Sequence, residues 1–294
     1  MIRTNERRCT EVYFKGEHLK LEELKQNDNL TLNDYLYNLI PPQPEEVEIK
    51  VSYLRHNTSL QGYHGIWDSE GFKKPSQSDS PKRDLVWWSP DISRRDITIA
   101  EEQYLNRQGF YNEVKPFLHK FTSSPAFLAS SRMGNFRFSM SIDELLKSYK
   151  QQFCEGQEPN IRIFETVVYK QEVMYSIVIH APHVQDLFSE YPLLPKHRDA
   201  VCVFRKDTII WRPQAMSKTH RFYLSPNKQA IRIRTKARKN YMWDNIGVAF
   251  HVPDGQIFRF SKAILCKSLR LCEGAEPKLN SEEFVKCEFD PIRP

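Results

Sequence analysis

Residues 161–180 read IRIFETVVYKQEVMYSIVIH and carry the clearest structural signal in this chain of 294 residues. Apolar, aromatic and β-branched side chains dominate two runs, 161–169 and 172–180, and this composition is typical of β-strands. The polar sequence Tyr169-Lys170-Gln171 between the runs predicts the turn that joins them.

Short strand-like runs continue downstream of this pair of strands. No regular alternation of strands and helices follows residue 160, so we expect a largely antiparallel sheet rather than a parallel one. The expected strands cover residues 201–204, 208–211, 221–224, 230–235, 246–251 and 256–260.

The first half of the chain supplies the helices and the remaining strands. A short apolar run at 85–89 predicts a buried strand, and a helix is expected over 94–106. Ser141-Ile142-Asp143-Glu144 predicts a capped helix that follows a strand at 136–140 and ends near residue 152. The fold class is therefore α+β, with one or two mixed, largely antiparallel sheets and a few flanking helices.

Three regions are expected along the chain. Residues 1–45 form a polar N-terminal segment with a short helix that begins near Asp28, and the prolines at 41–44 end that helix. Residues 46–182 form an α+β region, and residues 183–294 form a strand-rich C-terminal region. A boundary at 182–195 and one continuous α+β unit both remain open.

The overall composition excludes several classes of protein. Hydrophobic residues make up 40% and charged residues 27%, which is typical of a globular chain. The first ten residues, MIRTNERRCT, contain no apolar run, and the chain has no apolar stretch of membrane-spanning length. We therefore expect a cytoplasmic or nuclear protein with six reduced cysteines and no membrane association, and a net charge of +6 mildly favours an acidic partner.

Residues 47–72 contain the strongest candidate for a ligand site. Val47, Ile49, Val51 and Tyr53 alternate with polar residues and predict a half-buried strand over 47–54. Thr58 or Ser59 is expected to cap a helix, and Gly71 is expected to end it in a left-handed conformation. This arrangement places Arg55 and His56 beside a helix N-terminus, where an anionic or phosphate-bearing ligand is favoured.

The string Leu54-Arg55-His56-Asn57-Thr58, followed by Ile66 and Gly71-Phe72, resembles the first motif of ADP-ribosyltransferases of the poly(ADP-ribose) polymerase type. In that family a strand ends in His-Gly-Thr or His-Gly-Ser, and a helix follows. The resemblance covers residues 47–180 at most. Asn57 stands where the family has glycine, and residues 185–294 have no obvious counterpart.

The resemblance implies NAD as the cofactor and assigns roles to particular residues. His56 and Thr58 are expected to hold the nicotinamide ribose, with Arg55 beside them. Trp87 and Trp88 are the candidates for the aromatic residue that stacks on nicotinamide, a position at which the family usually has tyrosine. Glu172 is the candidate catalytic glutamate, and Glu165 is its rival. A carboxylate in that place stabilises the oxocarbenium-like state that forms when the glycosidic bond breaks.

The run 231–239, IRIRTKARK, supports a different hypothesis. In an extended strand, Arg232, Arg234, Lys236 and Arg238 share one face, which suits a nucleic-acid backbone or an acidic protein. The structural alternative is an edge strand whose charges prevent aggregation. Two hypotheses therefore remain: an active or degenerate ADP-ribosyltransferase-like protein that uses NAD, and a non-catalytic module that binds nucleic acid or protein.

Overall fold

The computed structural model describes most of the chain. Its described residues are 1–5, 9–31, 47–74, 84–107, 124–131, 133–170, 172–194, 201–206, 208–214, 222–227, 230–235 and 243–272, with the single residues 33, 36, 109, 118 and 199. Among them, no helix has both the length and the apolar character needed to cross a membrane.

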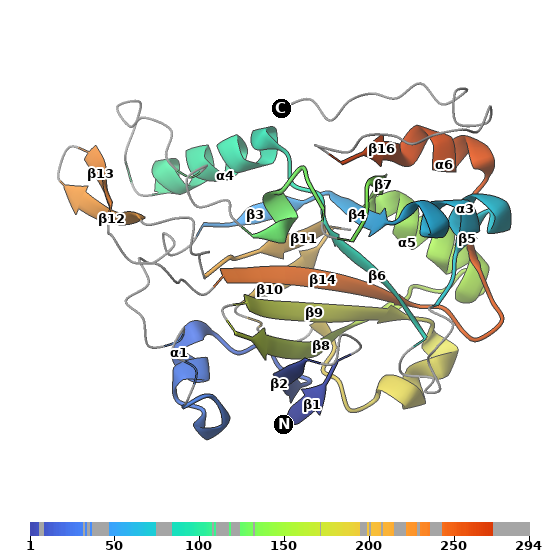
Figure 1. The fold of residues 1–294 in the computed structure, drawn as a ribbon, viewed down its shortest axis with the longest axis horizontal. Helices are drawn as coiled ribbons and strands as arrows, with labels where there is room; N and C mark the ends of the chain where they lie inside the picture. Colours follow the sequence, from blue (N-terminus) through green and yellow to red (C-terminus); the bar gives the residue numbers. More distant parts are fainter. Residues whose placement is uncertain are drawn as a thin grey trace.

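A nine-stranded sheet runs through the centre of the molecule (Figure 1). All its described neighbours are antiparallel except one pair, so the predicted mixed, largely antiparallel α+β fold is confirmed. The strands in spatial order are β1 (Ile2–Thr4), β2 (Thr10–Lys15), β8 (Asn160–Tyr169), β9 (Glu172–His180), β14 (Trp243–His251), β6 (Leu85–Pro90), β4 (Tyr53–Thr58), β7 (Phe136–Ser141) and β16 (Leu269–Leu271).

The parallel pair is β9 with β14, and it joins strands from two of the regions expected along the chain. β14 lies between β9 and β6, so strands from 46–182 and from 183–294 share one sheet. β1 and β2 also belong to this sheet, although the sequence predicted only a polar segment for residues 1–45.

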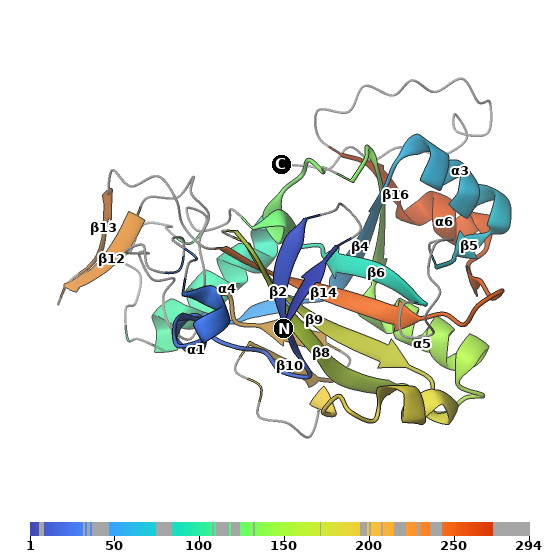
Figure 2. The same ribbon diagram turned by 60° about the horizontal axis from the view of Figure 1, so that its bottom comes forward.

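Three smaller sheets accompany the large one. The first contains β10 (Cys202–Arg205), β11 (Thr208–Trp211) and β3 (Ile49–Val51). The other two are ribbons: β15 (Phe258–Arg259) pairs with β5 (Gly71–Phe72), and β12 (Phe222–Asn227) pairs with β13 (Ala230–Thr235). Figures 1 and 2 both place the β12–β13 ribbon at the end of the molecule opposite α3 and α6.

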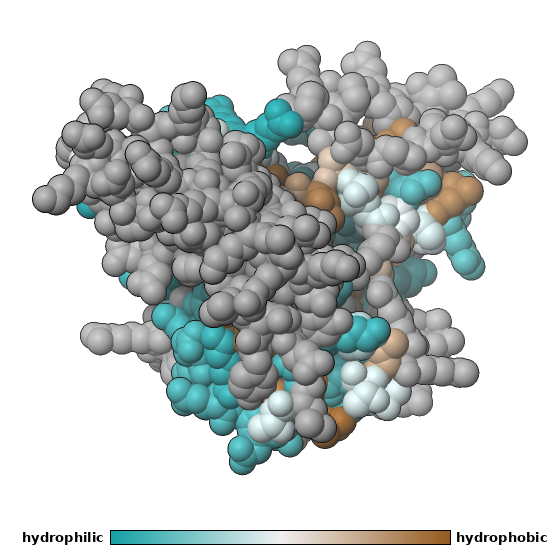
Figure 3. Space-filling view, turned by 60° about the vertical axis from the view of Figure 1, so that its left-hand side comes forward, coloured by the Kyte–Doolittle hydropathy of each residue, from teal (hydrophilic) through white to brown (hydrophobic). Residues whose placement is uncertain are grey.

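Helices cover the sheets from several directions. They are α1 (Leu21–Lys25), α3 (Leu60–Ser69), α4 (Arg94–Arg107), α5 (Ile142–Phe153) and α6 (Lys262–Ser268), with short 3₁₀ helices η1 (Asp28–Leu30), η4 (Pro125–Phe127) and η5 (Pro182–Phe188). On the side of the molecule that Figure 3 shows, the described surface is mostly hydrophilic and its hydrophobic residues form small patches.

Local side-chain chemistry explains where two of the helices begin. The Ser59 hydroxyl accepts a hydrogen bond from the Gly62 N–H at 3.2 Å, and the Ser141 hydroxyl accepts one from the Glu144 N–H at 3.1 Å. Each hydroxyl satisfies a backbone donor that lacks an intrahelical partner. Both helix starts confirm the sequence prediction.

The predicted end of α3 was wrong by one residue. Glu70 adopts the left-handed conformation with φ 52°, whereas Gly71 begins β5. Glycine is needed at 71 for a different reason: a Cβ atom there would lie 2.3 Å from the carbonyl oxygen of Phe258 on the paired strand β15.

Candidate functional site

The residues predicted for the ligand site lie on two opposite faces of β4 and β6. Arg55 pairs with Ser89 across the two strands, and side chains alternate along each strand, so Arg55, Trp87 and Ser89 share one face. His56, Thr58 and Trp88 belong to the other. We call these the polar face and the aromatic face.

On the aromatic face, His56 is packed among large rings. Its imidazole centroid lies 5.1 Å from that of Phe72 and 5.6 Å from that of Trp88, and both of these side chains are fully buried. Its Nδ1 lies 2.9 Å from the carbonyl oxygen of Trp87. Burial lowers the pKa of His56, and the bond to the Trp87 carbonyl opposes that shift. The backbone pairing of β4 with β6 ends at Arg55 and Ser89. The neutral imidazole of His56 thus continues the contact between the two strands beyond that point.

Thr58 lies at the end of this face, next to α3. Its Oγ1 occupies the position at which a side chain of residue 62 would begin, only 1.9 Å from a Cβ built on Gly62. Gly62 therefore lies within the helix so that Thr58 can approach its first turn. Together with the burial of Trp88, this packing makes the aromatic face part of the hydrophobic core.

On the polar face, two buried arginines share one carboxylate. Arg55 and Arg137 have 3% and 2% of their surface exposed, and both lie within 4 Å of Asp91. Ser139 also donates a hydrogen bond to Asp91. The side chain of Asp91 is 24% exposed, so solvent reaches this cluster at the carboxylate.

The two arginines also hold the segment after η4 against the sheet. The Leu128 carbonyl accepts hydrogen bonds from Arg55 at 2.8 Å and from Arg137 at 3.1 Å. Arg137 donates a further bond to the Asn57 side chain at 2.9 Å. Burial and the like charge of Arg137 lower the pKa of Arg55 to about 10, although Asp91 opposes this shift. An anionic ligand near this pair would reduce the repulsion between the guanidinium groups.

The polar face continues from β6 onto β14. Gly247 lies beside Trp87, whose ring is 3.2 Å from the position that a Cβ atom on Gly247 would occupy. Asn245 is two residues earlier on the same face of β14 and is half-buried. Its Oδ1 is buried and accepts no hydrogen bond from the described residues. A ligand with a hydroxyl or amide donor would satisfy that oxygen.

The structure places neither predicted glutamate beside His56 or Arg55. Glu172 pairs with Trp243, whereas Trp88, which His56 contacts, pairs with Val248. With β14 and β6 between β9 and β4, strand spacings of about 4.8 Å and a rise of about 3.3 Å per residue separate His56 from Glu172 by roughly 20 Å.

Glu165 has a structural partner at the other side of the sheet. Its two carboxylate oxygens accept hydrogen bonds from the Arg3 guanidinium at 2.7 and 2.8 Å, and the residue is 5% exposed. Such a bidentate pair fixes both side chains. It ties β1 to β8, and three strands of the sheet lie between β8 and β4.

The basic run 231–239 is only partly described. Ala230–Thr235 forms β13, in which Arg232 pairs with Ser225 and Arg234 with Tyr223, so the predicted extended conformation is confirmed there. Lys236 and Arg238 lie outside the described residues.

The cysteines depart from the prediction at one position. Among the described residues, Cys9, Cys154, Cys202 and Cys272 form no disulfide, but Cys266 forms one. The expectation of six reduced thiols was therefore wrong for Cys266. The sequence showed no paired spacing from which this bond could have been inferred.

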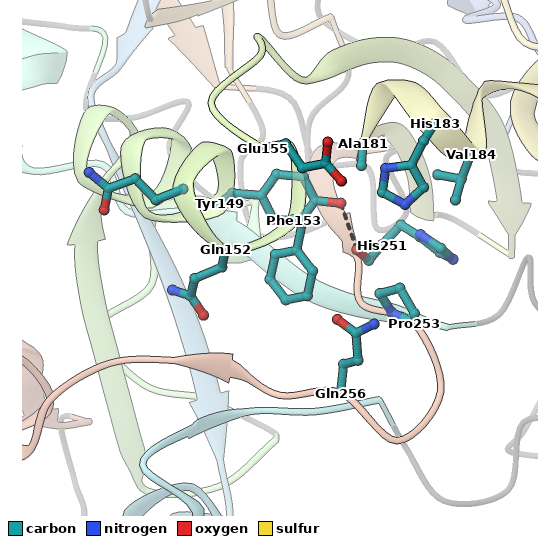
Figure 4. Close-up of a pocket in the computed structure, with 11 residues that line it drawn as sticks. Tyr149, Gln152, Phe153, Glu155, Ala181, His183, Val184, His251, Pro253 and Gln256 are labelled. Carbon is teal, nitrogen blue, oxygen red and sulfur yellow. Dashed lines mark hydrogen bonds between the residues drawn. The ribbon is translucent and has the colours of Figure 1, made fainter.

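A small pocket lies away from all the predicted site residues (Figure 4). It is formed by the end of α5, the start of η5 and the end of β14, and its volume is about 210 Å³. The Tyr149 hydroxyl donates a hydrogen bond to the His251 carbonyl at 2.6 Å beside it. Sites for drug-sized ligands are commonly about 300–1,000 Å³, so this pocket is too small for a dinucleotide.

Comparisons of this chain with protein-family models, with curated proteins and with solved structures found no match.

Proposed function

We propose that this protein binds NAD on the polar face of β4, β6 and β14, as a degenerate relative of the ADP-ribosyltransferases. The observation that carries the proposal is the presence of Arg55 and Trp87 on one face of adjacent strands. A guanidinium pair suits a diphosphate, and a half-buried indole suits a planar base or a nicotinamide ring. The proposal keeps the cofactor suggested by the resemblance but assigns it to Arg55 and Trp87 rather than to His56, Thr58 and Trp88.

The polar face offers each kind of contact that a dinucleotide requires. Arg55 and Arg137 provide positive charge beside the Asp91 carboxylate, which is 24% exposed. Trp87 and Ser89 are half-buried on the adjacent strand, and the Asn245 Oδ1 supplies an acceptor for a ribose hydroxyl or a carboxamide N–H. Binding without transfer is the more economical function, because Glu172 lies roughly 20 Å along the sheet from Arg55 and Trp87, and Glu165 is held by Arg3.

Thermal unfolding in the presence of NAD tests the proposal. A ligand at one hundred times its Kd stabilises the folded state by about 2.7 kcal/mol, so saturating NAD should raise the Tm by several degrees. Loss of a stacking aromatic costs about 1–3 kcal/mol of binding, so Trp87→Ala should weaken NAD binding roughly tenfold or more.

The matched control lies one residue from Arg55 on the opposite face. His56→Ala should lower the Tm of the free protein while preserving the NAD-induced increase. No stabilisation by NAD or ADP-ribose in the parent protein would overturn the proposal, as would loss of stabilisation in His56→Ala but not in Trp87→Ala. Release of nicotinamide above the level of a heat-treated control would mean that the protein catalyses cleavage of NAD and does not only bind it.

A second candidate function is supported by the β12–β13 ribbon. Its strands pair with each other and with no other described strand, and two-stranded ribbons can enter a nucleic-acid groove. If Arg232 and Arg234 contact phosphates, changing both to alanine should flatten the salt dependence of RNA or DNA binding by about two units. The double change Arg94→Ala, Arg95→Ala removes the same charge from the exposed surface of α4 and serves as the control. Equal effects of the two pairs would exclude a specific role for the ribbon.

A further inference from the structure

A buried cluster of His18, Asp199 and Cys202 lies outside the site described above. His18 follows β2, whereas Asp199 and Cys202 lie at the start of β10, more than 180 residues later. The three residues are 8%, 6% and 0% exposed. Folding therefore brings an imidazole, a carboxylate and a thiol together in the interior.

The potential ligand atoms of these residues converge. His18 Nδ1 lies 2.8 Å from Asp199 Oδ2 and 3.9 Å from Cys202 Sγ. All three ligand atoms lie within 4.8 Å of one another. One ion could contact all three after a small outward movement of the carboxylate.

The surrounding hydrogen bonds orient the cluster as they do around metal ligands. The remaining ring nitrogen of His18, Nε2, lies 2.9 Å from the Ser176 carbonyl oxygen. Asp199 Oδ2 accepts a hydrogen bond from the Cys202 N–H at 2.8 Å. Metal-binding histidines commonly donate their second N–H to a carbonyl, and bound carboxylates are commonly held by a further donor.

The two nitrogens of His18 present a specific chemical problem. A neutral imidazole has only one N–H, yet both of its nitrogens face oxygen acceptors here. A metal ion on Nδ1, with the proton on Nε2, satisfies both positions. The alternative is a doubly protonated ring paired with Asp199.

We propose that His18 Nδ1, Asp199 Oδ2 and Cys202 Sγ bind a zinc ion. Zinc accepts nitrogen, oxygen and sulfur ligands in one tetrahedral site. Bond lengths of about 2.0 Å to nitrogen and about 2.3 Å to sulfur place those two ligand atoms about 3.5 Å apart, close to the observed separation. The fourth position is left for water or another donor. Binding releases the thiol proton of Cys202, because the thiolate is the metal ligand.

The ion would have a structural role. It would join the segment after β2 to β10 and, through Ser176, to β9 in the large sheet. It would also balance the charge of a buried thiolate beside a buried carboxylate.

Zinc content and zinc-dependent stability test this proposal together. The full chain, purified without chelator, should contain about one zinc per molecule by elemental analysis. After removal of the metal, added Zn²⁺ should raise the Tm. Cys202→Ser should bind zinc at least tenfold more weakly and lose most of that increase.

Cys154→Ser is the matched control, because Cys154 is also free and buried but is not part of this cluster. It should retain one zinc and the full increase in Tm. Asp199→Asn provides a second variant in case Cys202→Ser does not fold. Cobalt(II) added to the metal-free protein should show a thiolate charge-transfer band that Cys154→Ser keeps. No zinc in the purified protein and no effect of added Zn²⁺ would overturn the proposal and assign the cluster to a charged His18–Asp199 pair.

Discussion

The two faces of β4 and β6 carry very different chemistry, although their residues alternate within a few positions of sequence. The aromatic face places Trp88 in the core and packs the half-buried His56 against it, where rings fill the space beneath α3 and α5. The polar face places Arg55 beside the partly exposed carboxylate of Asp91, and Trp87 is half-buried against the hydrophobic cluster around Phe164. Adjacent residues of one motif therefore belong either to the aromatic packing or to the polar cluster, and the strand alternation decides which.

This difference bears on the expected contact between His56 and the ribose of NAD. A histidine at a strand end favours a ligand contact only if its ring faces a cleft. Here the imidazole completes the packing around Phe72 and bonds to the Trp87 carbonyl. The arginine before it points to the opposite face, toward Asp91 and the Leu128 carbonyl.

The largest effect that can test the comparison is expected from the adjacent tryptophans. Trp88→Ala leaves a large cavity in the core and should lower the free energy of unfolding by about 3–5 kcal/mol. Trp87 is half-buried, so Trp87→Ala should cost less than half as much. Guanidinium denaturation measures both, and equal losses would remove the distinction between the faces.

The next effect concerns the carboxylate of the polar face. Asp91→Asn leaves Arg55 and Arg137 without their shared negative charge, which should cost about 2 kcal/mol after allowance for the partial exposure of Asp91. Urea denaturation of the variant measures this loss.

Asp143→Asn is the control for that change. Asp143 forms an exposed ion pair with Lys147 on α5 and should change stability by less than about 0.5 kcal/mol. Similar losses in the two variants would mean that the arginine cluster contributes no more than a surface pair.

A smaller effect is expected from the pH dependence of the aromatic face. Because the folded-state pKa of His56 is lowered, protonation favours the unfolded chain below its ordinary pKa of about 6.5. Stability from this group is present above that pH and is lost as pH falls toward the lowered folded-state pKa. His56→Gln should therefore show a smaller decrease in Tm between pH 7 and pH 5 than the parent protein.

Two further histidines sharpen that measurement. His64→Gln, at an exposed position of α3, should leave the pH profile unchanged. Burial lowers the pKa of His180 to about 4, so His180→Gln should flatten the profile down to about that pH. An identical profile for His56→Gln and the parent would contradict the assignment of His56 to the core.

The smallest effect is expected from the residue first assigned to catalysis. Glu172→Gln should reduce the NAD-induced increase in Tm far less than Trp87→Ala does, because Glu172 lies roughly 20 Å from Arg55 and Trp87 and only its neighbour Asn245, about 8 Å away, belongs to the proposed site. A calorimetric titration would measure this. A tenfold loss of NAD affinity in Glu172→Gln would mean that the ligand extends across β14 and β9.

Local signals in the sequence predicted much of the fold. The hydroxyl caps at Ser59 and Ser141 need only nearby backbone donors, and the turn at Lys170 needs one left-handed residue, which has φ 52°. The end of α3 was misplaced because the reason for Gly71 is a contact with Phe258, nearly 190 residues away. A contact between residues so far apart in sequence leaves no recognisable pattern in the residues around Gly71.

The candidate site was less predictable for the same reason. The residue types were found, but their division between two faces depends on which strands pair and on what covers them. Leu128, Asp91 and Arg137 reach Arg55 from separate segments, and Asn245 comes from a strand about 190 residues later. The histidine, carboxylate and thiol of the zinc proposal are separated just as widely, and no ligand spacing connects them.

The position of β14 has a consequence for how the chain reaches this structure. β14 is among the last described strands to be synthesised, yet it lies in the middle of the sheet, between β9 and β6. Until residues 243–251 leave the ribosome, β9 and β6 each present an unpaired edge, and such edges readily join those of other chains. Completing the sheet also requires contacts between residues far apart in sequence, which slows folding. We therefore expect chaperones to shield these strand edges of the nascent chain during most of its synthesis.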